Sequence, residues 1–199
     1  MAQSSMHFFL NWAKERIDEM DAALASLEAR ASEIEADLRA KSEQALADLR
    51  KTRDDFKTTV QKQADAGEAA WESAKSRLDR DWARFEAEAQ QYVETFGEQA
   101  AQGQAMFKLQ AEAQLKAWRE AADKMQAAAD EFAADRRSEI DATLASMKAG
   151  AAAAEERLRK LNKAGTQSWS TLVAALTETR AIFDRANQSA REAFRKAAG

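Results

Sequence analysis

The side chains that could perform chemistry in this sequence are mostly carboxylates. Paired acids occur at Asp54-Asp55 and Glu155-Glu156, and general acid–base catalysis commonly uses two carboxylates held in different environments. Adjacent residues of a helix point in different directions, and both pairs lie among Lys and Arg at the spacing of helical ion pairs. We therefore interpret these acids as part of a solvated helix face.

Metal and thiol chemistry have few residues to draw on. The sequence contains a single histidine, His7, and no cysteine, whereas an ordinary zinc site uses several such ligands. It also lacks a phosphate-binding glycine loop, a nucleophile with a histidine partner and an HExxH-type spacing. We expect no metal, no cofactor and no enzymatic activity.

Charge and hydropathy patterns narrow the classes of partner. The basic clusters at 51–53, 136–137 and 157–160 are short and flanked by acids, in a chain of net charge -4. Nucleic-acid binding is therefore not expected. No run approaches the roughly 18 apolar residues of a transmembrane segment, and the first ten residues lack the features of a secretory signal. We expect a cytoplasmic protein.

The elements that position these residues must be helices. The sequence has no proline and only six glycines, and it is rich in the residues of coiled coils and long helices. From Leu10 to Leu38 apolar residues recur in alternating steps of three and four, which is a heptad pattern. The stripe continues less regularly to Phe96 and then from Phe107 to Phe194. This pattern predicts an all-α protein with two helices of about 90 residues.

The predicted hinge between the two helices is the segment 97–103, which contains Gly97 and Gly103. A reversal there gives a long antiparallel coiled-coil hairpin that makes one elongated domain, residues 1–199. Residues whose numbers sum to about 200 should then face each other, as Leu24 faces Leu176.

Charge supports this pairing independently. Residues 1–50 contain ten acidic and six basic side chains, whereas residues 151–199 contain five acidic and nine basic ones. A hairpin lays these two quarters side by side, and flanking charges of opposite sign favour one helix orientation over the others.

Side-chain size gives a second argument for the hairpin. In this register Trp71 meets Ala129, and Trp169 meets Ala31, so that large residues face small ones. The predicted packing residues are Gly67, Trp71, Gly165, Trp169 and Phe132. Five tryptophans and nine phenylalanines are more than two helices can bury. The hairpin must therefore either dimerise into a four-helix assembly or fold back at Gly67 and Gly165. We expect the straight hairpin with self-association.

The two predicted helices, before and after the hinge, also resemble each other in sequence. This suggests an internal duplication, in which 118–194 repeats 12–96. At an offset of 106 positions Trp12 matches Trp118, and at an offset of 98 Trp71 matches Trp169.

An apolar cluster near the N-terminus has two interpretations. It could insert into a lipid or granule interface, because bulky apolar residues beside a charged helix suit such binding. It could instead close the open end of the hairpin against Phe183 and Phe194, which is the interpretation we favour. The residues concerned are Phe8, Phe9, Leu10 and Trp12.

One stretch resembles a known family. The segment from Phe107 to Phe132, which includes Gln110-Ala111-Glu112-Ala113-Gln114-Leu115-Lys116-Ala117-Trp118, is similar to the Ala- and Gln-rich amphipathic helices of bacterial phasins, which coat polyester granules. The chain as a whole is similar in style to apolipoprotein-type helical repeats, although those usually carry proline between repeats. The resemblance implies peripheral binding to a lipid or granule surface.

Two hypotheses of function follow. The first is a non-enzymatic structural or scaffold protein that acts through self-association, as a homo-oligomer, or through helix-mediated binding of a protein partner. The alternative is a phasin-like protein whose helices open and lay their apolar stripes on a lipid or polyester-granule surface.

Overall fold

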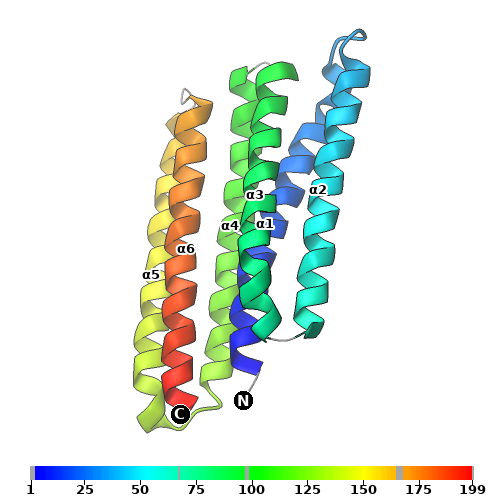
Figure 1. Cartoon of the computed structure of the whole chain (residues 1–199). Coiled ribbons are helices and arrows are strands. Elements are labelled where there is room, and N and C mark those ends of the chain that lie inside the picture. Colours follow the sequence, from blue (N-terminus) through cyan, green and yellow to red (C-terminus); the bar gives the residue numbers. More distant parts are fainter. Residues whose placement is uncertain (1–2, 67, 97–98, 165–167, 199) are drawn as a thin grey trace.

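The computed structural model describes residues 3–66, 68–96, 99–164 and 168–198, and it is built almost entirely of helices (Figure 1). The α-helices are α1 (Gln3–Ala29), α2 (Arg39–Ala66), α3 (Glu68–Phe96), α4 (Gln99–Ala129), α5 (Ala134–Ala164) and α6 (Trp169–Ala198). A single turn of 3-10 helix, η1 (Ala31–Glu33), follows α1.

The prediction of an all-α chain is confirmed, but the prediction of two helices of about 90 residues is wrong. The α-helices are 27 to 31 residues long. Figure 1 shows them running alternately up and down, as in an antiparallel bundle. The heptad stripe is therefore divided among several helices that pack on one another.

Two of the chain reversals separate α2 from α3 and α5 from α6, beside positions 67 and 165. α2 ends at Ala66 and α5 ends at Ala164, so the chain folds back at both places and the straight arms were the wrong choice between the two alternatives. Gly67 and Gly165 themselves, like Gly97, lie outside the described residues.

Two further reversals, at 30–38 and 130–133, were not predicted because these segments contain neither glycine nor proline. The first interrupts the most regular part of the heptad stripe. Ile34 adopts an extended backbone there and turns its side chain into the core. Tertiary packing thus overrides local helix propensity at this point.

The bundle consists of two three-helix halves joined through their first helices. α1 packs most extensively against α4, while α2 and α3 cover one side of α1, and α5 and α6 cover α4. The first half encloses a core around Trp12, Phe56 and Trp71. The second encloses a core that includes Trp118 and Phe183, whose ring centroids are 5.5 Å apart.

α6 also packs against α1, and here the predicted register is present. Arg16 pairs with Asp184, and Glu19 pairs with Arg180, so the partners' numbers sum to about 200. The register does not extend along the chain, because α2 packs on α1 and α3, whereas α5 packs on α4 and α6. The acidic first quarter and the basic last quarter therefore meet only through α1 and α6, because their remaining residues lie in α2 and α5, which pack within their own halves.

The duplication stays a prediction, and its second copy, 118–194, begins in the middle of α4 and not at the start of the second half. Trp71 and Trp169 both lie in the first turn of a third helix, α3 or α6. The segments matched at the larger offset differ in structure, since 32–38 forms η1 and a turn while 138–144 lies within α5.

Gly103 is not a hinge residue, since it lies inside α4 and is buried. A Cβ atom placed on it would lie 2.9 Å from the Trp169 ring. The absence of a side chain at Gly103 therefore leaves room for the Trp169 indole at the start of α6. Ser168 caps that helix by accepting a hydrogen bond from the Thr171 amide at 3.4 Å, as expected of a serine N-cap.

This contact gives the first testable prediction. Gly103→Ala adds a methyl group against a rigid indole, so it should lower the free energy of unfolding by about 1 kcal/mol, although alanine is the better helix former. In a Trp169→Leu background the clash is absent, and the same change should be neutral or stabilising. Chemical denaturation of the four proteins measures both effects; a stabilising Gly103→Ala in the unaltered chain would contradict the assignment.

Candidate functional site

α1 is unusual because it is buried on almost every side. Its apolar stripe packs within the first half of the bundle, while its opposite face meets α4 and α6. Polar side chains on that face are consequently taken out of water. The buried polar residues of α1 are Asn11, Glu15, Arg16, Glu19 and Ser26.

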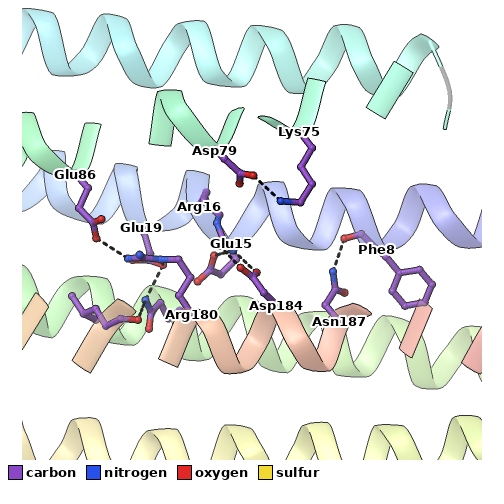
Figure 2. Close-up of polar contacts among 12 residues, drawn as sticks. Phe8, Glu15, Arg16, Glu19, Lys75, Asp79, Glu86, Arg180, Asp184 and Asn187 are labelled. Carbon is purple, nitrogen blue, oxygen red and sulfur yellow. Dashed lines mark hydrogen bonds and ion pairs between the residues drawn. The ribbon is translucent and has the colours of Figure 1, made fainter. Parts of the chain in front are cut away.

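The centre of this polar region is an ion pair between Glu19 of α1 and Arg180 of α6. Arg180 donates from Nε and Nη2 to the two carboxylate oxygens of Glu19, at 3.1 and 2.9 Å. Its Nη2 also donates to Glu86 of α3 at 3.2 Å. Figure 2 shows the guanidinium lying between these two carboxylates. One arginine thus ties α6 to both α1 and α3.

α4 contributes a neutral residue to the same cluster. The Gln114 amide donates to Glu19 at 2.9 Å and to the carbonyl oxygen of Leu176 at 3.1 Å. Glu19 therefore receives hydrogen bonds from two helices of the other half of the bundle. Such bonds to a buried carboxylate are stronger than bonds between neutral groups.

A second ion pair lies one helical turn away. Arg16 donates from Nη1 and Nη2 to the two oxygens of Asp184, at 2.8 and 2.6 Å, and its Nη1 also lies 2.7 Å from Glu15. Beyond it, Asn187 donates to the Phe8 carbonyl oxygen at 2.8 Å (Figure 2). The polar contacts therefore run along the whole α1–α6 seam, which we define as the contact between α1 and α6 from Phe8 to Glu19.

Aromatic rings flank both arginines. The Arg180 guanidinium lies 4.4 Å from the Trp82 ring centroid, and that of Arg16 lies 4.7 Å from the Trp12 ring, which is the range of cation–π attraction. Several polar atoms of the seam make no hydrogen bond within the chain, among them Glu15 Oε1 and Gln114 Oε1. The seam is thus strongly bonded at its ion pairs and poorly satisfied between them.

The two buried glutamates of α1 have opposite pKa shifts. Burial raises the pKa of Glu15 well above its usual value, and the negative charge of Glu19 adds to this effect against the opposing charge of Arg16. Burial would also raise the pKa of Glu19, but the ion pair with Arg180 and the hydrogen bonds it accepts hold its pKa below the usual value. Of the two glutamates, Glu19 is therefore the one whose surroundings favour the charged form.

A groove of about 280 Å³ lies beside the seam. Its floor contains the aromatic residues Phe8, Phe9, Trp12 and Trp71, and its polar lining comes from α3 and α6. The Phe9 and Trp71 ring centroids are 3.7 Å apart. Phe8, at the end of this floor, packs edge-on against Phe194 with centroids 5.5 Å apart.

The structure brings some predicted site residues together but does not display them. Phe8, Phe9 and Trp12 are buried, and of the N-terminal cluster only Leu10 is exposed, at 37%. Phe132 packs edge-on against Phe194. The N-terminal cluster therefore offers no apolar patch to an interface in the closed bundle.

The charged residues of the seam were missed by the sequence analysis. Glu15, Arg16 and Glu19 lie off the apolar stripe of α1, so the pattern assigns them to solvent. A clue was present in the predicted register, which sets Arg180 opposite Met20 in a row of otherwise apolar residues. An arginine at such a position needs a buried acid, and Glu19 is adjacent to Met20.

Comparison with models of protein families, with curated proteins and with solved structures finds no match to this chain. In the part of the chain that the structure describes, no helix is long and apolar enough to cross a membrane. The described residues also include no group of three His, Cys, Asp or Glu side chains placed to hold a metal ion.

The central ion pair yields the second prediction. Glu19→Gln removes the buried carboxylate that pairs with Arg180 and leaves the guanidinium with Glu86, which is more exposed. Breaking a buried pair costs about 3–5 kcal/mol. We expect the variant to lose most of its cooperative thermal transition at neutral pH.

A matched control is Glu139→Gln, which removes the same charge from an exposed pair with Lys196. This variant should unfold at the same temperature as the unaltered protein. Equal thermal midpoints for Glu19→Gln and Glu139→Gln, measured by circular dichroism, would contradict the role of the buried pair.

Glu15 provides the third prediction, with the opposite sign. A raised pKa in the folded state favours folding at low pH, and the penalty for burying Glu15 grows as the pH rises above the ordinary pKa of 4.5. Glu15→Gln should therefore raise stability at pH 7 and have little effect at pH 4. Denaturation at both pH values tests this difference; destabilisation at pH 7 would show that Glu15 is buried as a paired anion.

Proposed function

We propose that this protein is a non-enzymatic, peripheral coat protein of apolar surfaces, such as lipid or polyester granules, and that it binds them by opening its helical bundle. The observation that carries the proposal is the combination of inward-facing amphipathic helices with a charged network between the two halves. Apolar faces that pack only on one another can be transferred to an interface when the halves separate.

The closed surface has little apolar area to offer. Among the described residues, the large hydrophobic side chains counted as exposed are Leu10 and Leu109, each at 37%. A protein that binds an apolar surface with this fold must therefore expose its core. The same observation gives the closed form a reason to remain soluble in water while unbound.

The energetics of opening differ between water and an interface. In water, separation of the halves exposes apolar area at about 25 cal/mol per Å². An apolar surface covers that area again, and Glu15 and Arg180 regain the hydration that burial removes. Opening is thus unfavourable in bulk water and favoured where an apolar surface is present.

The resemblance to phasin helices adds support to the proposal. The segment that carries it begins at Phe107 and occupies most of α4, the helix that packs on α1 between the halves. α4 would be uncovered on the α1 side when the halves separate.

The scaffold hypothesis is the second candidate, and it predicts self-association instead. Its main argument was the excess of aromatic residues over what a two-helix rod can bury. Trp12, Trp71, Trp82 and Trp118 are buried within one chain, so this argument no longer requires a second copy.

The proposal makes a fourth prediction, tested by flotation with oil droplets coated with uncharged phosphatidylcholine. The protein should float with the droplets and keep its helical circular dichroism, because the helices rearrange without unfolding. The double variant Leu10→Gln/Leu109→Gln removes the exposed apolar side chains and should bind equally well, since binding uses the core. A protein that stays in solution, with a mass above that of the monomer by light scattering, would contradict the proposal and favour the scaffold.

A further inference from the structure

The two helices of the seam carry opposite charge. α1 contains the acids Glu15, Asp18, Glu19, Asp21 and Glu28 and only two strong bases, Lys14 and Arg16. α6 contains three acids and five bases, namely Arg180, Arg185, Arg191, Arg195 and Lys196. The closed bundle thus presents a basic helix to an acidic one.

α6 combines this charge with a continuous apolar face. Leu172, Leu176, Phe183 and Phe194 are all buried, and they recur at helical spacing along one side of the helix. Arg185 and Arg195 lie at the exposed surface. A basic amphipathic helix of this kind suits an interface that is apolar below and negatively charged above.

Within the protein, carboxylates occupy the position that anions of such an interface would take. Arg180 meets Glu19 from α1 and Glu86 from α3, and the neutral Gln114 from α4 shares the Glu19 oxygen. On the neighbouring turn Arg16 of α1 holds Asp184 of α6. Glu15 also touches this cluster, since it pairs with Arg16.

We propose that the interaction surface of α6 prefers an anionic lipid surface over a neutral one, and that α1 acts as an internal substitute for that surface in the closed bundle. This inference rests on the proposed function. In the bound state, lipid phosphates replace Glu19 and Glu86 around Arg180, and the apolar face of α6 rests on the acyl chains. Separation of α1 from α6 is then the step that an anionic surface promotes.

Competition between carboxylates and phosphates predicts how vesicle binding changes with lipid charge and salt, and how it changes in charge variants. Binding should be stronger on anionic than on neutral vesicles and should weaken with salt, because screening acts on the exposed charges at the lipid surface more than on the buried pair. Weakening the internal acids should favour binding, whereas removing exposed cations of α6 should weaken it.

The experiment compares vesicles of phosphatidylcholine with vesicles of equal parts phosphatidylcholine and phosphatidylglycerol. Because the chain lacks cysteine, fluorescent labels can be attached to single cysteines introduced at the exposed positions Ala25 on α1 and Thr177 on α6. A second labelled pair, at Lys51 on α2 and Arg84 on α3, is the control for a half that stays closed. On binding, energy transfer should fall between the labels at 25 and 177 and stay unchanged between those at 51 and 84. The affinity of the protein should be about tenfold higher for the anionic vesicles than for the neutral ones.

Charge variants distinguish binding through α6 from nonspecific binding of the protein to charged vesicles. Arg185→Gln/Arg195→Gln should lower affinity for anionic vesicles about tenfold, whereas the matched pair Arg77→Gln/Arg80→Gln on α3 should leave it unchanged. Glu86→Gln keeps the Glu19 pair and the fold, and it should lower the anionic lipid fraction needed for separation of the labels at 25 and 177.

Three results would overturn the inference. The first is equal binding to both vesicles by a protein that still floats with neutral oil droplets, which leaves the proposed function standing. The second is equal loss of binding in the two double arginine variants. The third is separation of α1 from α6 by short duplex DNA or inorganic phosphate, which would show a response to polyanions in general. A protein that binds neither kind of vesicle and does not float with the oil droplets would instead refute the proposed function itself.

Discussion

The ion pair between Glu19 and Arg180 is the constraint on which the rest of the bundle depends. Two charges are held out of water at the centre of the molecule, and each needs the geometry that the surrounding helices impose. α1 must be enclosed by helices of both halves to bury Glu19, and α6 must pack on α1 for Arg180 to reach it. Removal of either partner leaves an unpaired charge, which is far more damaging than the loss of an exposed pair.

This arrangement connects the fold to the proposed activity. Most of each apolar core lies within one half, although Met106 of α4 belongs to the first core and Phe8 of α1 to the second, so separation of the halves leaves most of each core together. The seam itself is rich in charges that water solvates well, and poor in fully satisfied hydrogen bonds. The contact between the halves therefore has a charged part, where α6 meets α1, and an extensive part where α4 packs on α1, and opening separates both.

The sequence predicts the helical class and the pairing of its ends, but not the number of helices. Heptad periodicity and the absence of proline are local properties, and they correctly indicate helices. The charge asymmetry between the first and last quarters predicts that these segments meet, as Glu19 and Arg180 do. The turn at 30–38 has no local cause, because the side chain of Ile34 is drawn into a core formed by distant segments.

The candidate site was hidden from sequence reasoning for a related reason. A periodic pattern assigns one face of a helix to the core and the other to solvent, whereas α1 is covered on both faces. Glu15 and Glu19 therefore read as exposed acids until the positions of α4 and α6 are known. Gly103 was misassigned in the same way, because only the tertiary structure shows Trp169 against it.

The most direct measurement of the central claim is the binding of a bundle that cannot open at the seam. Cysteines introduced at positions 25 and 177, in a chain with none of its own, would be joined by a cleavable thiol crosslinker within the monomer. The account predicts that the crosslinked protein stays in solution beside phosphatidylcholine-coated oil droplets and floats with them once the crosslink is cleaved. Equal flotation before and after cleavage would contradict it, because binding would then occur without separation of α1 from α6.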